Sequence, residues 1–175
     1  MRIIESMESK LPISKEKLTF REVWIGGGSK QELLQNLKDN KIEINEYGLQ
    51  IINHKGFIIN PTKEKLQTVE ISLADLGFLN GATTQEVYQR AQQFGLNLCP
   101  SELAVHMRLQ YIDFSQQIDP IVGHWQNIAM KELSDDLDFP RGFYLRRRED
   151  GFWIRGYRSS PEHLWSSSDR FVFMC

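Results

Sequence analysis

Aromatic and arginine residues alternate in two adjacent stretches of the sequence, residues 143–148 and 152–158. In an extended strand, every second side chain lies on the same face. One face of the first stretch carries Tyr144, Arg146 and Arg148, and one face of the second carries Trp153, Arg155 and Tyr157. Aromatic rings stack on bases or sugars, and arginine pairs with phosphates or carboxylates. If the faces of the two stretches coincide, the pattern predicts a binding surface, which Trp165 in the next loop would extend.

The segment between the two stretches favours that coincidence. Asp150-Gly151 separates two aromatic-rich runs, which is a strong signal for a β-hairpin. A structural role is the alternative, because cross-strand aromatic and arginine pairs also stabilise a half-exposed sheet, by about 0.2–1 kcal/mol each. Nearby acidic residues would in addition neutralise part of the positive charge. These are Glu149, Asp150, Glu162 and Asp169.

Other residues offer weaker candidates for chemistry. Gly26-Gly27-Gly28-Ser29-Lys30 could present N–H groups to a phosphate, but it lacks the glycine spacing of either common phosphate-binding motif. We therefore expect a loop followed by a helix capped by Ser29. Cys99 could be a nucleophile with a distant histidine, although a cysteine between Leu98 and Pro100 is more often packed in a core.

The carboxylates of one acidic turn could hold a divalent cation, but the turn lacks the glycine and the final glutamate of a calcium-binding loop. They belong to Glu132, Asp135, Asp136 and Asp138. The four histidines are scattered, and none has a His or Cys at metal-ligand spacing. We therefore expect no catalytic residue, no metal and no cofactor.

Composition limits the classes of function. The chain has 175 residues, of which 41% are hydrophobic and 25% are charged, and its formal charge is −2. These values are typical of one globular domain that carries no overall field for nucleic acid or an anionic membrane. We expect neither a membrane span nor a signal peptide, because no apolar stretch is long enough for either. These features, together with only two cysteines, predict a cytoplasmic protein.

Local patterns predict strands and helices in alternation. Expected strands are 17–25, 66–73, 124–131, the two stretches of the hairpin, and 171–174. Expected helices run from Ser29 to Asn40, from a capping box of Thr83 and Glu86 to Gly95, and onward from Pro100 with Ser101 or Cys99 as cap. Whether the region of Leu109 and Tyr111 continues that helix or forms a strand stays open. Residues 41–66 have no clear pattern, and residues 1–16 are predicted to be a loosely ordered segment.

The expected fold is a single α+β domain over residues 1–175, with an antiparallel sheet, a C-terminal β-meander and about three helices. The segment from Leu76 to Glu102 carries the most specific sequence signal, LGF-x-x-GAT-x-x-E-x-Y-x-RA followed by GL-x-LCP-x-E. With the closing Arg170-Phe171-Val172-Phe173, it resembles a family of small bacterial proteins of unknown function. The resemblance covers roughly the last two thirds of the chain. It implies one domain of bacterial type and transfers no activity, cofactor or site residue.

The sequence leaves three functions open. The first is a non-catalytic binding domain that uses the aromatic–arginine face, with another protein as the expected partner. The second is a nucleic-acid-binding protein that uses the same face. The third is an enzyme of unknown class with Cys99 or the acidic turn in its site. The sequence does not determine the oligomeric state.

Overall fold

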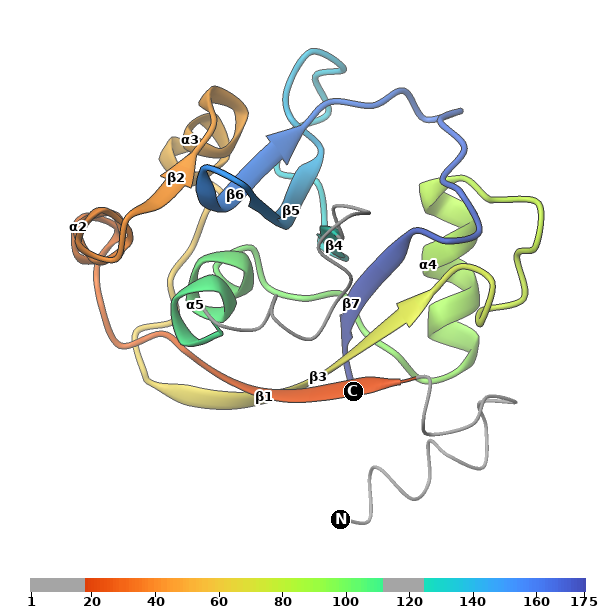
Figure 1. The fold of residues 1–175 in the computed structure, drawn as a ribbon, viewed down its shortest axis with the longest axis horizontal. Coiled ribbons are helices and arrows are strands. Elements are labelled where there is room, and N and C mark those ends of the chain that lie inside the picture. The colour runs from red at the N-terminus through yellow and green to blue at the C-terminus, as the bar shows by residue number, and fades with distance from the viewer. Residues whose placement is uncertain (1–17, 112–124) are drawn as a thin grey trace.

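The computed structural model describes residues 18–111 and 125–175, which form one curled sheet with helices on both of its faces (Figure 1). The α+β prediction is confirmed. The predicted segment 1–16 lies outside the described residues. None of the helices in the described ranges is long and apolar enough to cross a membrane.

Seven strands form the sheet within the described residues, in the order β1-β3-β7-β4-β5-β6-β2. The strands are β1 (Thr19–Ile25), β2 (Ile42–Ile44), β3 (Glu64–Ser72), β4 (Trp125–Ile128), β5 (Gly142–Arg148), β6 (Gly151–Tyr157) and β7 (Arg170–Met174). The described helices are α2 (Lys30–Asp39), α3 (Glu46–Asn53), α4 (Thr84–Gln93) and α5 (Leu103–Gln110).

The prediction of an antiparallel sheet is wrong, because the sheet is mixed. β4 pairs in parallel with β7, and β2 pairs in parallel with β6, while the other pairs are antiparallel. Hairpin signals reveal only neighbours joined by a short turn. Parallel neighbours are joined by long connections, which leave no such local signal. β4, β5 and β6 form the expected meander, but β7 and β2 flank it in parallel.

The described residues contain four helices, where about three were expected. The additional helix is α3, in the stretch that had no clear pattern. Asn45 caps it by accepting the Gly48 N–H at 2.9 Å, and Ile51 and Ile52 are fully buried. Gly48 within so short an element obscured the apolar period in the sequence.

Of the three helices that the sequence predicted, two begin with the expected cap and the third does not. Ser29 with Glu32, and Thr83 with Glu86, form the capping boxes of α2 and α4. α5 begins at Leu103, so the prediction of Ser101 or Cys99 as its cap is wrong. Its N-cap residue, Glu102, makes no capping bond, because the Glu102 side chain binds two loops instead. The helix continues to Gln110, which settles the open assignment near Leu109.

The concave side of the sheet holds the larger core. Figure 1 shows α5 within the curve of the sheet, between β1 and β3 on one side and β5 and β6 on the other. Leu103, Ala104 and Val105 of α5 are fully buried there, against strand residues such as Val23 and Leu145. Since α5 is enclosed, few of its residues are exposed, and its sequence lacks the strong amphipathic period of α4.

The convex side is covered by α4 over only part of its width. Val87 and Ala91 of α4 pack with Val69, Phe171 and Phe173 of β3 and β7. Farther along the same face, β5 and β6 carry side chains that stay partly exposed. This uncovered end of the sheet holds the residues predicted to bind.

Candidate binding site on the C-terminal sheet

The two aromatic–arginine stretches form the predicted hairpin, and their faces coincide. In the antiparallel register of β5 and β6, Tyr144 lies opposite Arg155 and Arg146 lies opposite Trp153. Directly paired residues share one face of a sheet. Leu145 pairs with Ile154 on the other face, where both are buried. The six side chains therefore lie on one face of the sheet, as the prediction required.

β4 extends that surface on its other side. Trp125 lies opposite Arg146, and Asn127 lies opposite Tyr144. Trp125 is 38% exposed, whereas Asn127 is buried and donates from Nδ2 to the Arg170 carbonyl at 3.1 Å. The aromatic–arginine face thus spans three strands.

A hollow of about 290 Å³ lies on this face. Of the seven predicted residues, four line it, namely Tyr144, Arg146, Tyr157 and Trp165. The other lining residues are Trp125, Asn127, Arg158, Ser159 and His163. Sequence reasoning missed these five. Trp125 and Asn127 alternate on one side of an expected strand, but nothing local showed that this strand adjoins the hairpin.

Four aromatic rings run around the hollow in an unbroken series of contacts. The ring centroids are 6.4 Å apart for Trp125 and Tyr144, 6.4 Å for Tyr144 and Tyr157, and 5.4 Å for Tyr157 and Trp165. The contacts are edge-to-face or tilted, as aromatic pairs prefer. Together the four rings form a continuous aromatic surface around the hollow.

Trp165 is held at the edge of the hollow by the start of α4. Its backbone exchanges hydrogen bonds with Ala82, at 2.9 and 3.2 Å. Its Nε1 donates to Thr84 Oγ1 at 2.9 Å. A side chain on Gly81 would lie 2.4 Å from the Trp165 carbonyl oxygen, so glycine is required there. These contacts connect the loop that carries Trp165 to the segment with the most specific sequence signal.

Tyr157 lies across Gly142, its partner in the register. A Cβ at Gly142 would lie only 3.1 Å from the Tyr157 hydroxyl oxygen. Burial, more than the nearby charge of Glu132, raises the pKa of the Tyr157 phenol well above its usual range. Tyr157 therefore stays a neutral donor and acceptor at any ordinary pH.

Arg146 is the cation of the hollow that has no counter-ion among the described residues. Its guanidinium lies 5.3 Å from the Trp125 ring centroid, within cation–π range. Its Nε is buried and donates to no described group. Arg158, by contrast, pairs with Asp138. Within the described part of the chain no Asp or Glu lines the hollow.

The three other predicted residues form a separate cluster beside the hollow. The guanidiniums of Arg148 and Arg155 lie 5.7 and 5.2 Å from the Trp153 ring centroid. Trp153 Nε1 donates to Asp150 Oδ1 at 2.9 Å, and Asp150 also pairs with Arg148 at 3.6 Å. The Trp153 ring is thus already in contact with two cations, which is the stabilising role expected for such pairs.

Comparisons of the chain with protein-family models, with curated proteins and with solved structures find no match. The resemblance to a bacterial family thus stays a prediction. The function has to be argued from the geometry of this chain.

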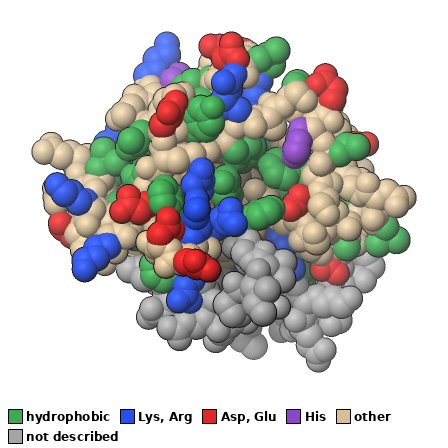
Figure 2. All heavy atoms as spheres, turned by 45° about the horizontal axis from the view of Figure 1, so that its top comes forward, with side chains coloured by type: hydrophobic (Ala, Val, Ile, Leu, Met, Phe, Trp, Pro, Cys, Tyr) green, Lys and Arg blue, Asp and Glu red, His purple; other side chains and the backbone are tan. Residues whose placement is uncertain are grey.

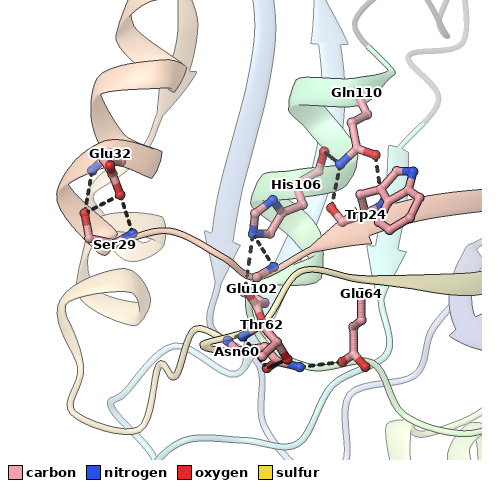
Figure 3. Close-up of polar contacts among 10 residues, drawn as sticks. Trp24, Ser29, Glu32, Asn60, Thr62, Glu64, Glu102, His106 and Gln110 are labelled. Atoms are coloured by element: carbon pink, nitrogen blue, oxygen red, sulfur yellow. Dashed lines mark hydrogen bonds and ion pairs between the residues drawn. The ribbon is translucent and has the colours of Figure 1, made fainter.

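The glycine loop has a structural explanation. Glu102 Oε2 accepts the Gly26 N–H at 3.2 Å, Oε1 accepts the Asn60 N–H at 2.8 Å, and His106 Nε2 lies 3.1 Å from Oε2 (Figure 3). Gly27 donates to the Asn60 carbonyl at 2.9 Å. At the start of α2, Ser29 N–H and Oγ contact Glu32. The N–H groups of Gly26, Gly27 and Ser29 are thus already used within the protein.

Cys99 and the acidic turn show no arrangement for catalysis. Cys99 is buried, and burial raises the pKa of its thiol far above the usual range, so it is a poor nucleophile. In the turn, Glu132 pairs with Arg141 and Asp138 pairs with Arg158. Nowhere in residues 18–111 and 125–175 do three or more His, Cys, Asp or Glu side chains gather as a possible metal site.

A larger hollow of about 760 Å³ adjoins the first, and Ser159 lines both. It lies between α4 and residues 130–137, and three of its lining residues are glutamines of α4, namely Gln85, Gln89 and Gln92. Its arginine, Arg141, is already paired with Glu132. The smaller hollow is therefore the better candidate site, because it combines several rings with a cation that lacks an ion pair.

Proposed function

We propose that this protein is a non-catalytic binding domain that takes its partner on the aromatic–arginine face of the sheet, with the hollow at the centre. The observation that carries the proposal is the convergence of Tyr144, Arg146, Tyr157 and Trp165 on one hollow. Concave, largely aromatic sites with a few polar groups are typical of ligand binding. The catalytic candidates that the sequence offered are buried or paired with other residues.

Nucleic acid is a weaker candidate for the partner. On the face drawn in Figure 2, hydrophobic side chains lie around a central group of Lys and Arg side chains, and acidic groups are interspersed. The formal charge of the chain is −2. Binding to a phosphate backbone needs a broad basic surface, whereas this face has mixed charge, so nucleic acid is the weaker candidate.

The experiment is capture from a bacterial lysate by the immobilised protein, with the lysate divided into a small-molecule and a macromolecular fraction. Two variants separate the halves of the face. Arg146→Gln changes the hollow, and Trp153→Ala/Arg155→Ala changes the neighbouring cluster. Arg147→Gln is the matched control, because Arg147 lies on the same strand with its side chain toward Phe152 on the other face.

We expect a captured species that is retained by the control and lost from Arg146→Gln. Nuclease treatment and a salt series show whether that species is nucleic acid, since its affinity would fall steeply with salt. Equal recovery by wild type and both face variants would refute the proposal and leave these residues with a purely structural role.

A further inference from the structure

The hollow combines two features that together restrict its occupant. Its walls present four aromatic rings, and its cation without an ion pair is Arg146. Its lining also offers the Ser159 side chain, the imidazole of His163 and the paired guanidinium of Arg158. Each part selects a different portion of a ligand.

The arginine selects charge. Arg146 Nε is buried without a hydrogen-bond partner in the described residues, which is costly unless a ligand supplies the acceptor. An anion would meet that requirement, and arginine binds carboxylates and phosphates through two or more N–H groups at once. Because no described acidic residue lines the hollow, an anion would meet no like charge.

The rings select a flat apolar body. Trp125, Tyr144 and Tyr157 lie at centroid distances of 6.4 Å from one to the next, so they form a continuous wall. Trp165 extends it, and His163 packs on Trp165 at 4.8 Å. Flat rings stack on such surfaces with little regard to the identity of the ring.

The size restricts the occupant further. A volume of about 290 Å³ is at the lower end of the range for small-molecule sites, roughly 300–1,000 Å³. It accommodates one ring system with one charged group. A folded peptide or a nucleic-acid strand would instead need a long groove.

We propose that the occupant is a small molecule with a flat ring and a carboxylate or phosphate, with the ring against Trp125 and Tyr144 and the anion on Arg146. This inference rests on the proposed function, since it assigns the ligand class of the same face. The carboxylate and phosphate forms share one chemistry, which defined probes can separate.

The test is a titration followed by ¹H–¹⁵N NMR, in which each indole N–H gives its own signal. Trp125 and Trp165 report on the hollow, while Trp24 and Trp153 lie outside it and serve as internal controls. The carboxylate probe is naphthalene-2-carboxylate, paired with its neutral carboxamide. The phosphate probe is adenosine 5′-monophosphate, paired with adenosine and with inorganic phosphate.

We expect at least one anionic ring probe to shift the Trp125 and Trp165 signals saturably, and its neutral counterpart to bind about tenfold more weakly or worse, as for loss of a charge-assisted hydrogen bond. Arg146→Gln should remove that preference for the charged probe, and Arg147→Gln should keep it. Trp125→Leu, at a partly exposed site, should weaken both members of each pair.

Three results would overturn the inference. Equal affinity for charged and neutral ring probes would show that the ligand needs no anionic group. Equal affinity for inorganic phosphate alone would show that it needs no ring. If no probe shifted the Trp125 and Trp165 signals, the assignment of the hollow as a small-molecule site would be refuted. If the capture experiment still shows a species lost from Arg146→Gln in that last case, the binding domain stands and only the ligand class fails.

Discussion

Glu102 accepts the backbone N–H of Asn60 at 2.8 Å, and so connects α5 to a loop 42 residues earlier in the chain. The same carboxylate accepts the Gly26 N–H at 3.2 Å from the end of β1. One buried side chain therefore holds two loops on the helix enclosed by the sheet (Figure 3). This relationship explains both the glycine loop and the missing cap of α5.

Replacing Glu102 by Gln should destabilise the fold. A Gln side chain has one acceptor oxygen in place of two, so one of the two loop N–H groups would face an amide donor. An unsatisfied buried donor costs about 1–3 kcal/mol in the free energy of unfolding. Urea denaturation measures the change. Glu64→Gln is the control, because the exposed Glu64 side chain accepts from Asn60 Nδ2 and a Gln oxygen can replace it. An equal loss in both variants would contradict the role given to Glu102.

The conformation of Gly26 makes a second prediction. Gly26 and Gly95 both have a left-handed backbone, with φ of +75° and +80°. A Cβ at Gly26 would lie 2.3 Å from the Thr62 carbonyl oxygen, whereas nothing lies within 4 Å of a Cβ at Gly95. Gly95→Ala should therefore cost only the left-handed strain, about 1–2 kcal/mol.

Gly26→Ala should cost more than Gly95→Ala by about 1–3 kcal/mol, because the loop must also shift to accommodate the methyl group. Comparison of the two unfolding free energies isolates the steric part. Should the two variants lose the same stability, the close approach of the loop at 60–62 to Gly26 would be refuted.

The hairpin was predictable because its signals are local. A two-residue turn at Glu149-Asp150, followed by Gly151 with positive φ, fixes the register of β5 and β6, and the register decides which side chains share a face. The Ser29 cap and the Thr83–Glu86 capping box were recognisable for the same reason, since each signal lies within four consecutive residues.

The hollow was only half predictable, because Trp125 and His163 reach it through tertiary structure. Trp125 joins Tyr144 only after β4 pairs with β5, and that pairing depends on which strands the whole sheet places side by side. The split between Arg146 and Arg155 also escaped the sequence. Both are arginines on the same face, but Arg155 contacts Trp153, whereas Arg146 faces the hollow.

A buried ion-pair network on the concave side makes the third prediction. Glu70 pairs with Arg21 at 2.9 Å and with Arg170 at 2.7 Å, and it accepts from Gln126 Nε2 at 2.8 Å. Burial, more than the opposing effect of Glu70, lowers the pKa of Arg21. Neutralising the Glu70 carboxylate takes this ion-pair partner away from the arginines. Breaking a buried ion pair in this way typically costs about 3–5 kcal/mol in the free energy of unfolding.

Glu70→Gln should therefore lose a large part of the unfolding free energy, which is typically about 5–15 kcal/mol for a domain, as measured by thermal or urea unfolding. Glu22→Gln is the matched control on the neighbouring strand. Glu22 is exposed and pairs with Lys65 at the surface, so its replacement should change little. A mild effect of Glu70→Gln would show that the network contributes little.

The two thiols predict how stability depends on alkaline pH. Burial raises the pKa of the Cys175 thiol to about 11 and raises that of Cys99 still further. In the unfolded chain both would have a pKa of about 8.5. The unfolded state therefore loses thiol protons above pH 8.5 while the native state keeps them. The stabilisation is complete below that pH and is lost as pH rises toward the native pKa values, by up to about 1.4 kcal/mol per pH unit for the buried Cys99 thiol and by less for the partly exposed Cys175 thiol.

Cys99→Ala tests this dependence. The variant loses packing at every pH, but its unfolding free energy should fall less steeply between pH 8.5 and 9.5 than that of wild type, by about 1 kcal/mol per pH unit, because the unfolded thiol is only partly ionised in this range. Urea denaturation at several pH values gives both slopes. Tyr88 and Tyr157, whose pKa values burial also raises, contribute equally to the two proteins and cancel. Identical slopes would mean that Cys99 ionises as readily in the native protein as in the unfolded chain, and would contradict the raised pKa of its thiol.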